Sequence, residues 1–158
     1  MRISVALGSV LVSAALVGCQ PRPAQWNEQD TVTLRAVFDS TLQRLRAGNF
    51  SAWAAEFSND ARFYAPNAPP VIGRAAIQAW GQALPPVEQM AFSDVQVAGA
   101  GDLAWGTSGY SLKLKDVPAD TGKQLVVFRR SGTGAWEVVA GSFNSNLPVR
   151  QPAGPVRR

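Results

Sequence analysis

Apolar residues in the first half of the chain recur at intervals of three and four, which is the spacing of one helix face. The pattern predicts a long helix that opens at Asp30 and closes at Gly48, a residue suited to a helix end. Asn49 has the side chain of an N-cap and predicts a second, short helix. A third helix is expected over residues 73–83, because a pair of prolines follows it. The apolar positions of these helices are Leu34, Val37, Phe38, Leu45, Trp53, Phe57, Ile77 and Trp80.

The second half of the chain has the pattern and turn residues typical of strands. A short strand over residues 61–65 precedes the third helix. Four longer strands follow that helix, over residues 90–98, 103–115, 124–130 and 136–144. Helices first and hairpin-linked strands last predict an α+β domain with its helices on one face of an antiparallel sheet.

A short apolar segment precedes the predicted domain. Met1-Arg2 is followed by an uncharged run over residues 3–17, which is shorter than the ~20 residues that a membrane-spanning helix needs and predicts a signal peptide. The run ends in Leu16-Val17-Gly18-Cys19, which resembles the lipobox of bacterial lipoproteins. That resemblance implies cleavage before Cys19 and lipidation of its thiol. Gln20, where Asp would be a retention signal, resembles the signal for transport to the outer membrane of a Gram-negative bacterium.

Four segments are therefore expected. Residues 1–18 form a lipoprotein signal peptide, and residues 19–27 form a lipidated tether with two prolines. Residues 28–147 form the folded domain, and residues 148–158 form a disordered basic tail. Because two or three acyl chains hold a protein on a membrane almost irreversibly, we expect an outer-membrane lipoprotein that faces the periplasm.

Composition excludes several classes of chemistry. The chain has no histidine and one cysteine, which excludes histidine-dependent catalysis, imidazole metal sites, internal disulfides and multi-cysteine metal centres. Glycine-rich nucleotide-binding motifs are absent, and no carboxylate pair has a spacing that by itself indicates metal or glycosidase chemistry. We therefore expect neither a metal nor a cofactor.

The basic isoelectric point, about 9.8, does not indicate nucleic-acid binding. Five of the 15 basic residues lie in the terminal segments, which leaves the middle of the chain near neutrality against its 11 acidic residues. Arg129-Arg130 is the one basic pair there, and a single pair is usually a solvated strand end. We expect no nucleic-acid partner.

Several motifs along the predicted domain occur in a characteristic order. They are Trp53-Ala-Ala-Glu-Phe57, Asp60-Ala-Arg-Phe-Tyr-Ala-Pro66, Pro69-Pro-Val-Ile-Gly-Arg-Ala-Ala-Ile77 and Gly134-Ala-Trp-Glu-Val138. Together they resemble the SnoaL-like, nuclear-transport-factor-2-like superfamily, which includes the ketosteroid isomerases. The resemblance implies a cone-shaped, cystatin-like fold: a curved antiparallel sheet wrapped around a long N-terminal helix, with two shorter helices and an apolar pocket at the wide end.

The resemblance also bears on catalysis. Ketosteroid isomerases, a well-known case of pKa tuning, use a carboxylate base together with a tyrosine and a protonated aspartic acid as hydrogen-bond donors. Alignment of the motif that ends in Pro66 places Ala65 where the base would be. Thr41 stands near the helix position at which those relatives have tyrosine. We therefore expect no general-base isomerisation.

The expected pocket combines small, aromatic and hydroxyl-bearing side chains. Tyr110 shares a strand face with Ala104, Gly106 and Ser108, which leaves room above the sheet and offers its hydroxyl as a polar group. The full set of candidate pocket residues is Thr41, Phe63, Ala65, Trp80, Tyr110, Phe128 and Asn144.

The sequence favours a lipid-anchored exported protein that binds a small apolar or amphipathic molecule without catalysis. Two alternatives stay open: an isomerase- or cyclase-like enzyme that uses Tyr110 and a carboxylate, or an interaction scaffold whose pocket is filled. A homodimer is also expected, with Trp105 and Phe143 supplying apolar area on the convex face of the sheet. A cavity of several hundred cubic ångströms with converging polar groups would favour binding or catalysis. A pocket filled by Trp and Phe rings would favour the scaffold.

Overall fold

The computed structural model describes residues 25–148, which form three helices and six strands. The helices are α1 (Glu28–Arg46), α2 (Phe50–Ala54) and α3 (Arg74–Gln82). The strands are β1 (Phe57–Tyr64), β2 (Val71–Ile72), β3 (Val87–Ala100), β4 (Leu103–Leu114), β5 (Asp120–Arg130) and β6 (Trp136–Ser145). The predicted signal peptide, Cys19 with its lipidation, and residues 149–158 of the predicted tail lie outside the described residues.

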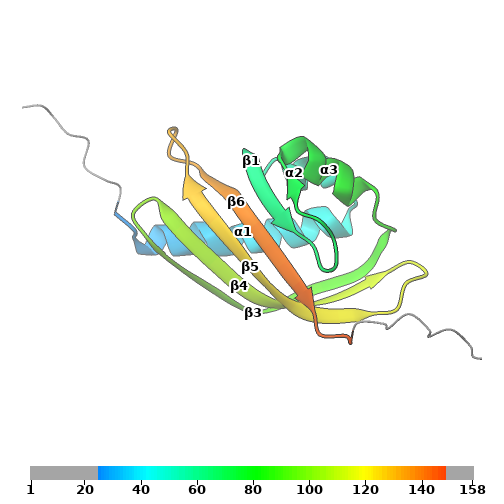
Figure 1. The fold of residues 1–158 in the computed structure, drawn as a ribbon. Coiled ribbons are helices and arrows are strands. Elements are labelled where there is room, and N and C mark those ends of the chain that lie inside the picture. Colours follow the sequence, from blue (N-terminus) through cyan, green and yellow to red (C-terminus); the bar gives the residue numbers. More distant parts are fainter. Residues whose placement is uncertain (1–24, 149–158) are drawn as a thin grey trace, which may run out of the picture.

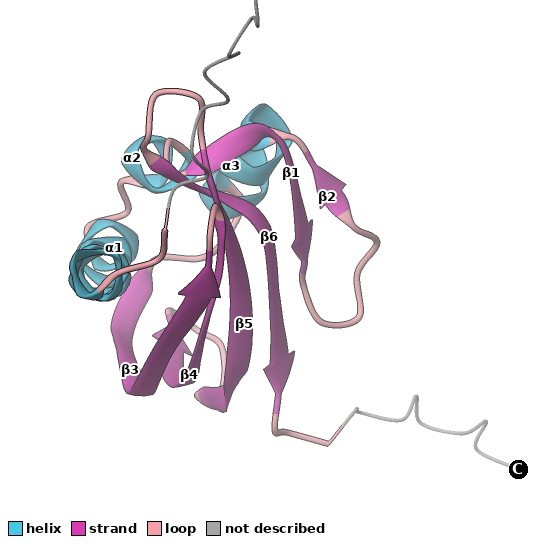
Figure 2. Cartoon of the chain, turned by 90° about the vertical axis from the view of Figure 1, so that its left-hand side faces the viewer, coloured by secondary structure: helices cyan, strands magenta, loops and turns pink. Residues whose placement is uncertain are grey.

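The six strands form one curved sheet in the order β2-β1-β6-β5-β4-β3 (Figure 1). In Figure 2, α1 is seen almost along its axis, and the sheet runs from β3 beside that helix to β2 on the opposite side. The predicted α+β class and the curved sheet around a long helix are confirmed. One pairing differs from a fully antiparallel sheet, because β1 lies parallel to β6. No hairpin constrains that pair, since α3 and four strands separate β1 from β6 in the chain.

The long helix begins and ends with local hydrogen-bond motifs. Asn27 caps the first turn through its side chain, and the Asp30 carboxylate accepts the Asn27 backbone N–H in return, which is a capping box. The helix therefore begins slightly before the predicted start. At the other end, Gly48 has a φ of +66°, and the N–H groups of Gly48 and Asn49 donate to the carbonyls of Leu45 and Arg44. This is a Schellman motif, and it confirms that Gly48 closes the helix.

The two longest strands curve because β3 contains a bulge. Register shifts between Ser93 and Gln96, and Asp94 there has a φ of +52°. An extra residue in one strand bends it and increases the local twist, which directs the sheet around α1. The two-residue β2 gives no periodic signal, which explains why the sequence did not predict it.

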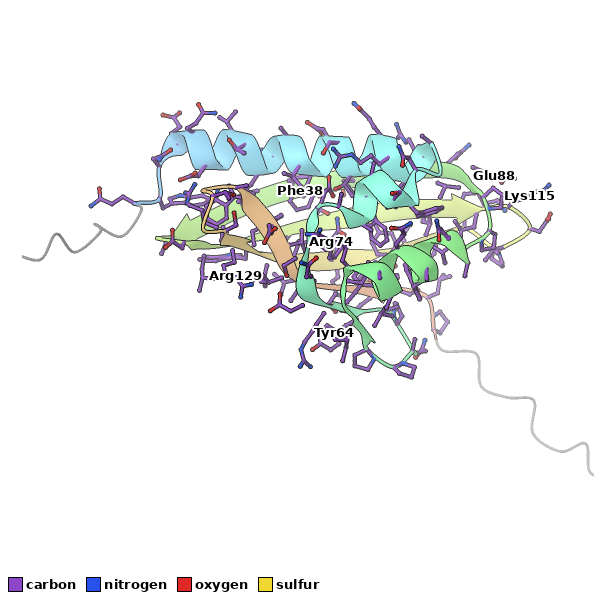
Figure 3. All side chains as sticks on the ribbon, turned by 90° about the horizontal axis from the view of Figure 1, so that it is seen from above. Phe38, Tyr64, Arg74, Glu88, Lys115 and Arg129 are labelled. Carbon is purple, nitrogen blue, oxygen red and sulfur yellow. The ribbon has the colours of Figure 1, made fainter. Side chains whose placement is uncertain are left out.

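Close contact between α1 and the sheet depends on a glycine. A Cβ atom at Gly106 of β4 would lie 2.6 Å from Cζ of Phe38, so only glycine leaves room for that ring. Phe38 projects from α1 toward the strands (Figure 3) and packs edge-on against Phe92 and Phe128. Leu34 and Ile77 are fully buried in the same core.

A buried ion pair joins the start of α1 to the ends of β5 and β6. Arg130 Nη2 donates to Asp30 Oδ1 over 2.8 Å, and the Trp136 indole N–H donates to the same oxygen over 3.1 Å. The guanidinium also lies 4.2 Å from the centre of the Trp136 ring. The expectation of a solvated strand end therefore holds for Arg129, whose side chain is 48% exposed, and is wrong for Arg130. The reason is Asp30, which is 100 residues away in the sequence but neutralises the buried charge of Arg130.

Candidate functional site

A cavity of about 120 Å³ lies between the helices and the concave face of the sheet. Side chains of α1, α2, α3 and of strands β1 and β3 to β6 line it, and most of them are apolar. The lining residues are Val37, Phe38, Thr41, Leu45, Phe50, Trp53, Glu56, Phe57, Phe63, Trp80, Leu84, Val87, Met90, Phe92, Tyr110, Leu112, Leu114, Gln124, Val126, Phe128, Val138, Gly141, Ser142 and Phe143.

A continuous set of aromatic rings forms one wall of the cavity. The Phe63 ring lies 5.0 Å from Trp80, 5.7 Å from Trp53 and 5.7 Å from Phe143, measured between ring centres. Tyr110 continues the set, with its ring centre 5.9 Å from that of Phe143. The Phe63–Phe143 pair is tilted and the other pairs are edge-to-face, and such contacts stabilise a packed aromatic cluster that fixes the shape of the wall.

Glu56 is the one carboxylate among the lining residues, and it sits between α2 and β1. The Thr41 hydroxyl donates to its Oε2 over 2.5 Å, and the Ser40 hydroxyl donates to Oε1 over 3.1 Å. Arg44 forms an ion pair with Oε1. Three residues of α1 therefore hold the carboxylate: Ser40 and Thr41 are adjacent, and Arg44 lies about one helical turn further along. The Glu56 side chain is 12% exposed.

The protonation of Glu56 reflects two opposing effects. Burial disfavours the charged form, whereas the Thr41 hydroxyl, the Arg44 charge and the Ser40 hydroxyl favour it. Burial prevails, so the pKa of Glu56 is raised above its ordinary value. Titratable groups with raised pKa in a cleft are frequent at functional sites, which makes Glu56 the principal polar candidate here.

A second polar group of the lining is fixed by its own partners. The Tyr110 hydroxyl donates to Asp120 Oδ2 over 3.0 Å, and Ser145 donates to the other oxygen of that carboxylate over 2.7 Å. Burial, the hydrogen bond and the charge of Asp120 all raise the pKa of Tyr110. The phenol thus stays protonated, with its proton engaged by Asp120. Gln124 is likewise engaged, since its amide donates to the Ser108 hydroxyl over 2.9 Å.

Five of the seven candidate pocket residues lie together in the lining. They are Thr41, Phe63, Trp80, Tyr110 and Phe128. Ala65 is half-buried against the core just past the end of β1 and is not among the lining residues.

Asn144 is exposed and is also outside the lining. Its neighbour Phe143 takes the inward position of β6, and successive strand residues face opposite sides. The same alternation corrects the expectation for the convex face. Trp105 lies there, 48% exposed, whereas Phe143 faces the cavity.

Sequence reasoning missed Glu56 as a functional candidate, although it lies inside one of the quoted motifs. A single glutamate near a helix end has no periodic signal, and its hydrogen-bond donors stand 12 to 16 residues earlier. The positions of Ser40, Thr41 and Arg44 on one side of the predicted helix were the only available hint.

The size of the cavity lies between the two expectations for the pocket. At about 120 Å³ it is smaller than a site for a drug-sized ligand, and aromatic rings occupy much of the cone. It is nevertheless open space with a carboxylate at its wall. Within residues 25–148, no group of three or more histidine, cysteine or acidic residues is placed to hold a metal ion. The helices of that range include none that is long and apolar enough to cross a membrane.

Solved structures with the same fold come from several bacteria. A ketosteroid isomerase-like protein from Erwinia carotovora is 18% identical, with a TM-score of 0.68 over 78% of this chain and 100% of that one. An NTF2-like protein of unknown function from Pseudomonas putida is 18% identical, with a TM-score of 0.69 over 78% and 91%. An NTF2-like protein with a cystatin-like fold from Novosphingobium aromaticivorans is 18% identical, with a TM-score of 0.61 over 73% and 80%.

At these identities the structures show a shared fold alone. No curated protein matches the sequence. The family model of the SnoaL-like domain matches residues 34–145, which is most of the folded part and more than half of the chain. The chain therefore belongs to the SnoaL-like domain family.

Proposed function

We propose that this protein is a lipid-anchored component of the bacterial cell envelope whose SnoaL-like domain binds a small apolar or amphipathic molecule without catalysis. The observation that carries the proposal is the cavity of about 120 Å³ with an almost entirely apolar lining and one carboxylate, Glu56, in its wall. A cavity of this kind stays dry and accepts a small apolar molecule, because water finds few partners there.

The position that the family resemblance assigns to the base supports binding over catalysis. Ala65, at the position that the family resemblance assigns to the base, carries no titratable group and does not line the cavity. Thr41 donates its proton to Glu56, and Tyr110 donates its proton to Asp120, so neither hydroxyl is available as a free donor in this structure. A positioned general base contributes about 10²–10⁴-fold to a rate, and alanine at the position of that base favours a binding role.

Titration with toluene tests the binding role directly. Leu84→Trp places a bulky indole ring at the cavity lining and is expected to abolish toluene binding measured by calorimetry. Leu103→Trp is the matched control, because Leu103 is 54% exposed and outside the lining, and should leave binding unchanged. Failure of the unmodified protein to bind toluene would contradict the proposal. If toluene does bind, mass spectrometry of an organic extract of the purified protein is the experiment that would identify a natural occupant.

The anchor rests on the lipobox-like sequence that ends at Cys19. Cys19→Ser is expected to leave an uncleaved precursor without lipid, because only a thiol accepts the diacylglyceryl group. Fractionation of the variant with the detergent phase as a mature protein would contradict the anchor. Detection of the unmodified protein in separated inner and outer membranes tests the expected outer-membrane location.

The outer face of the sheet supports the expected homodimer. Trp105 and Leu125 are both about half exposed there, and Val127 pairs directly with Trp105 in the ladder between β4 and β5. Light scattering should give about twice the monomer mass, and Trp105→Glu should give the monomer. Val32→Glu, at an exposed apolar position of α1, is the control that should not change the mass. A monomer at high micromolar concentration would rule out the dimer.

A further inference from the structure

We propose that the cavity selects a compact, neutral ring that carries one hydroxyl group, and that Glu56 accepts the hydrogen bond from this hydroxyl. The inference rests on the proposed binding function and names the chemical class of the ligand. It is built on the partners of Glu56, on the charges around it and on the size of the cavity.

The partners of Glu56 leave room for one more donor. A carboxylate offers about four lone-pair sites. Oε1 already accepts from Ser40 and Arg44, whereas Oε2 accepts only from Thr41. All three partners belong to α1, on one side of the carboxylate, and the residue itself lines the cavity. A ligand hydroxyl can therefore complete the set at Oε2 from the cavity side.

Charge restricts the ligand further. Glu56 and Arg44 already neutralise each other, so a cationic ligand would add an unpaired charge to an apolar cavity at a large desolvation cost. An anionic ligand, or one with only a carbonyl group, would face the oxygens of the carboxylate and be repelled. A neutral donor is the remaining class, and a hydroxyl is the smallest such group.

Cavity size restricts the rest of the ligand. The volume of about 120 Å³ is several times the share of one water molecule, about 30 Å³, and close to the roughly 150 Å³ of an engineered cavity that binds benzene. The ring wall of Phe63, Trp80 and Phe143 offers faces and edges for stacking. One ring with one hydroxyl matches both the space and the single polar position.

Phenol and toluene are matched probes, because a hydroxyl replaces a methyl group on the same ring. Calorimetry on the purified full chain gives the dissociation constant for each probe, and the ratio of the two constants is the readout. Glu56→Met removes the acceptor and is expected to shift the ratio about tenfold against phenol, which corresponds to about 1.4 kcal/mol. Toluene itself should bind the variant at least as well as the unmodified chain. Benzoate should not bind the unmodified chain.

Glu137→Met is the matched control, since Glu137 also pairs with an arginine, Arg74, but lies outside the cavity lining. It should leave the ratio unchanged. If both probes bind and Glu56→Met leaves the ratio unchanged, the inference is overturned and the proposed binding function stands. If neither probe binds the unmodified chain, the binding function and the inference both fail. If Glu56→Met does not fold, Glu56→Gln replaces it, with about a threefold shift expected and an unchanged ratio overturning the inference.

Discussion

Asp30→Asn is the sharpest test of how the start of α1 is held against β5 and β6. Oδ1 of Asp30 accepts from Arg130 and from Trp136, and Oδ2 accepts the backbone N–H of Asn27. Asparagine retains one oxygen for the first two donors but loses the charge. Its amide NH₂ would face the Asn27 N–H, donor against donor.

The expected loss of stability follows from these contacts. The side chains of Asp30 and Arg130 are 8% and 18% exposed, and breaking a buried pair by removing one partner costs about 3–5 kcal/mol. Arg130 keeps Asp102, with 3.5 Å between its Nε and Oδ1, and the asparagine oxygen keeps neutral hydrogen bonds. The loss of half the capping box adds about 1 kcal/mol. We therefore expect Asp30→Asn to lower the free energy of unfolding by about 2–3 kcal/mol, below the full cost of a broken pair.

Urea denaturation at neutral pH measures this loss, with Asp39→Asn on the exposed side of α1 as the control, expected within about 0.5 kcal/mol of the unmodified chain. A loss below about 0.5 kcal/mol for Asp30→Asn would refute the reasoning, because Asp30 would then behave as a surface residue.

Acidification gives a second readout. Burial of Asp30 opposes ionisation, but its hydrogen bonds with Arg130, Trp136 and Asn27 prevail and hold its pKa below the ordinary value. The stabilisation is thus complete above the pKa of the unfolded chain, about 4, and is lost as pH falls through the lower folded value. The difference in unfolding free energy between the unmodified chain and Asp30→Asn should therefore become smaller as pH falls below about 4.

Three further outcomes are expected. Gly106→Ala should cost about 1–3 kcal/mol in urea denaturation, because the new methyl group meets the Phe38 ring; an unchanged midpoint would show that α1 can move away. Because burial raises the folded pKa of Glu56, the free energy of unfolding of the unmodified chain should fall as pH rises above about 4.5. Glu56→Gln should remove this fall. Identical profiles of unfolding free energy against pH for the two proteins would contradict this. The unmodified protein should not isomerise a steroid enone, followed by absorbance; turnover that is lost in Tyr110→Phe would establish the enzymatic alternative.

Local chemistry in the sequence determined most elements of the fold. Helix spacing, the cap at Asn49 and the left-handed glycine at Gly48 depend on neighbouring residues, so their signals survive without tertiary context. The strands are also local patterns, although β3 and β5 extend beyond their predicted ends because pairing with neighbouring strands stabilises weakly patterned residues. The SnoaL-like motifs placed these elements in the right family.

Tertiary structure decided which side chains meet. The local sequence predicts that Arg130 lies at a solvated strand end, whereas the fold places it against Asp30, which is 100 residues away in the sequence. The local sequence around Glu56 is that of an ordinary surface glutamate. The fold buries it between α2 and β1, where three donors of α1 contact its carboxylate. Phe143 and Asn144 differ by one position, so their faces depend on the register of β6 against β5, which alternation alone leaves undetermined. Burial and long-range pairing set these environments, and neither is encoded in the local pattern of the chain.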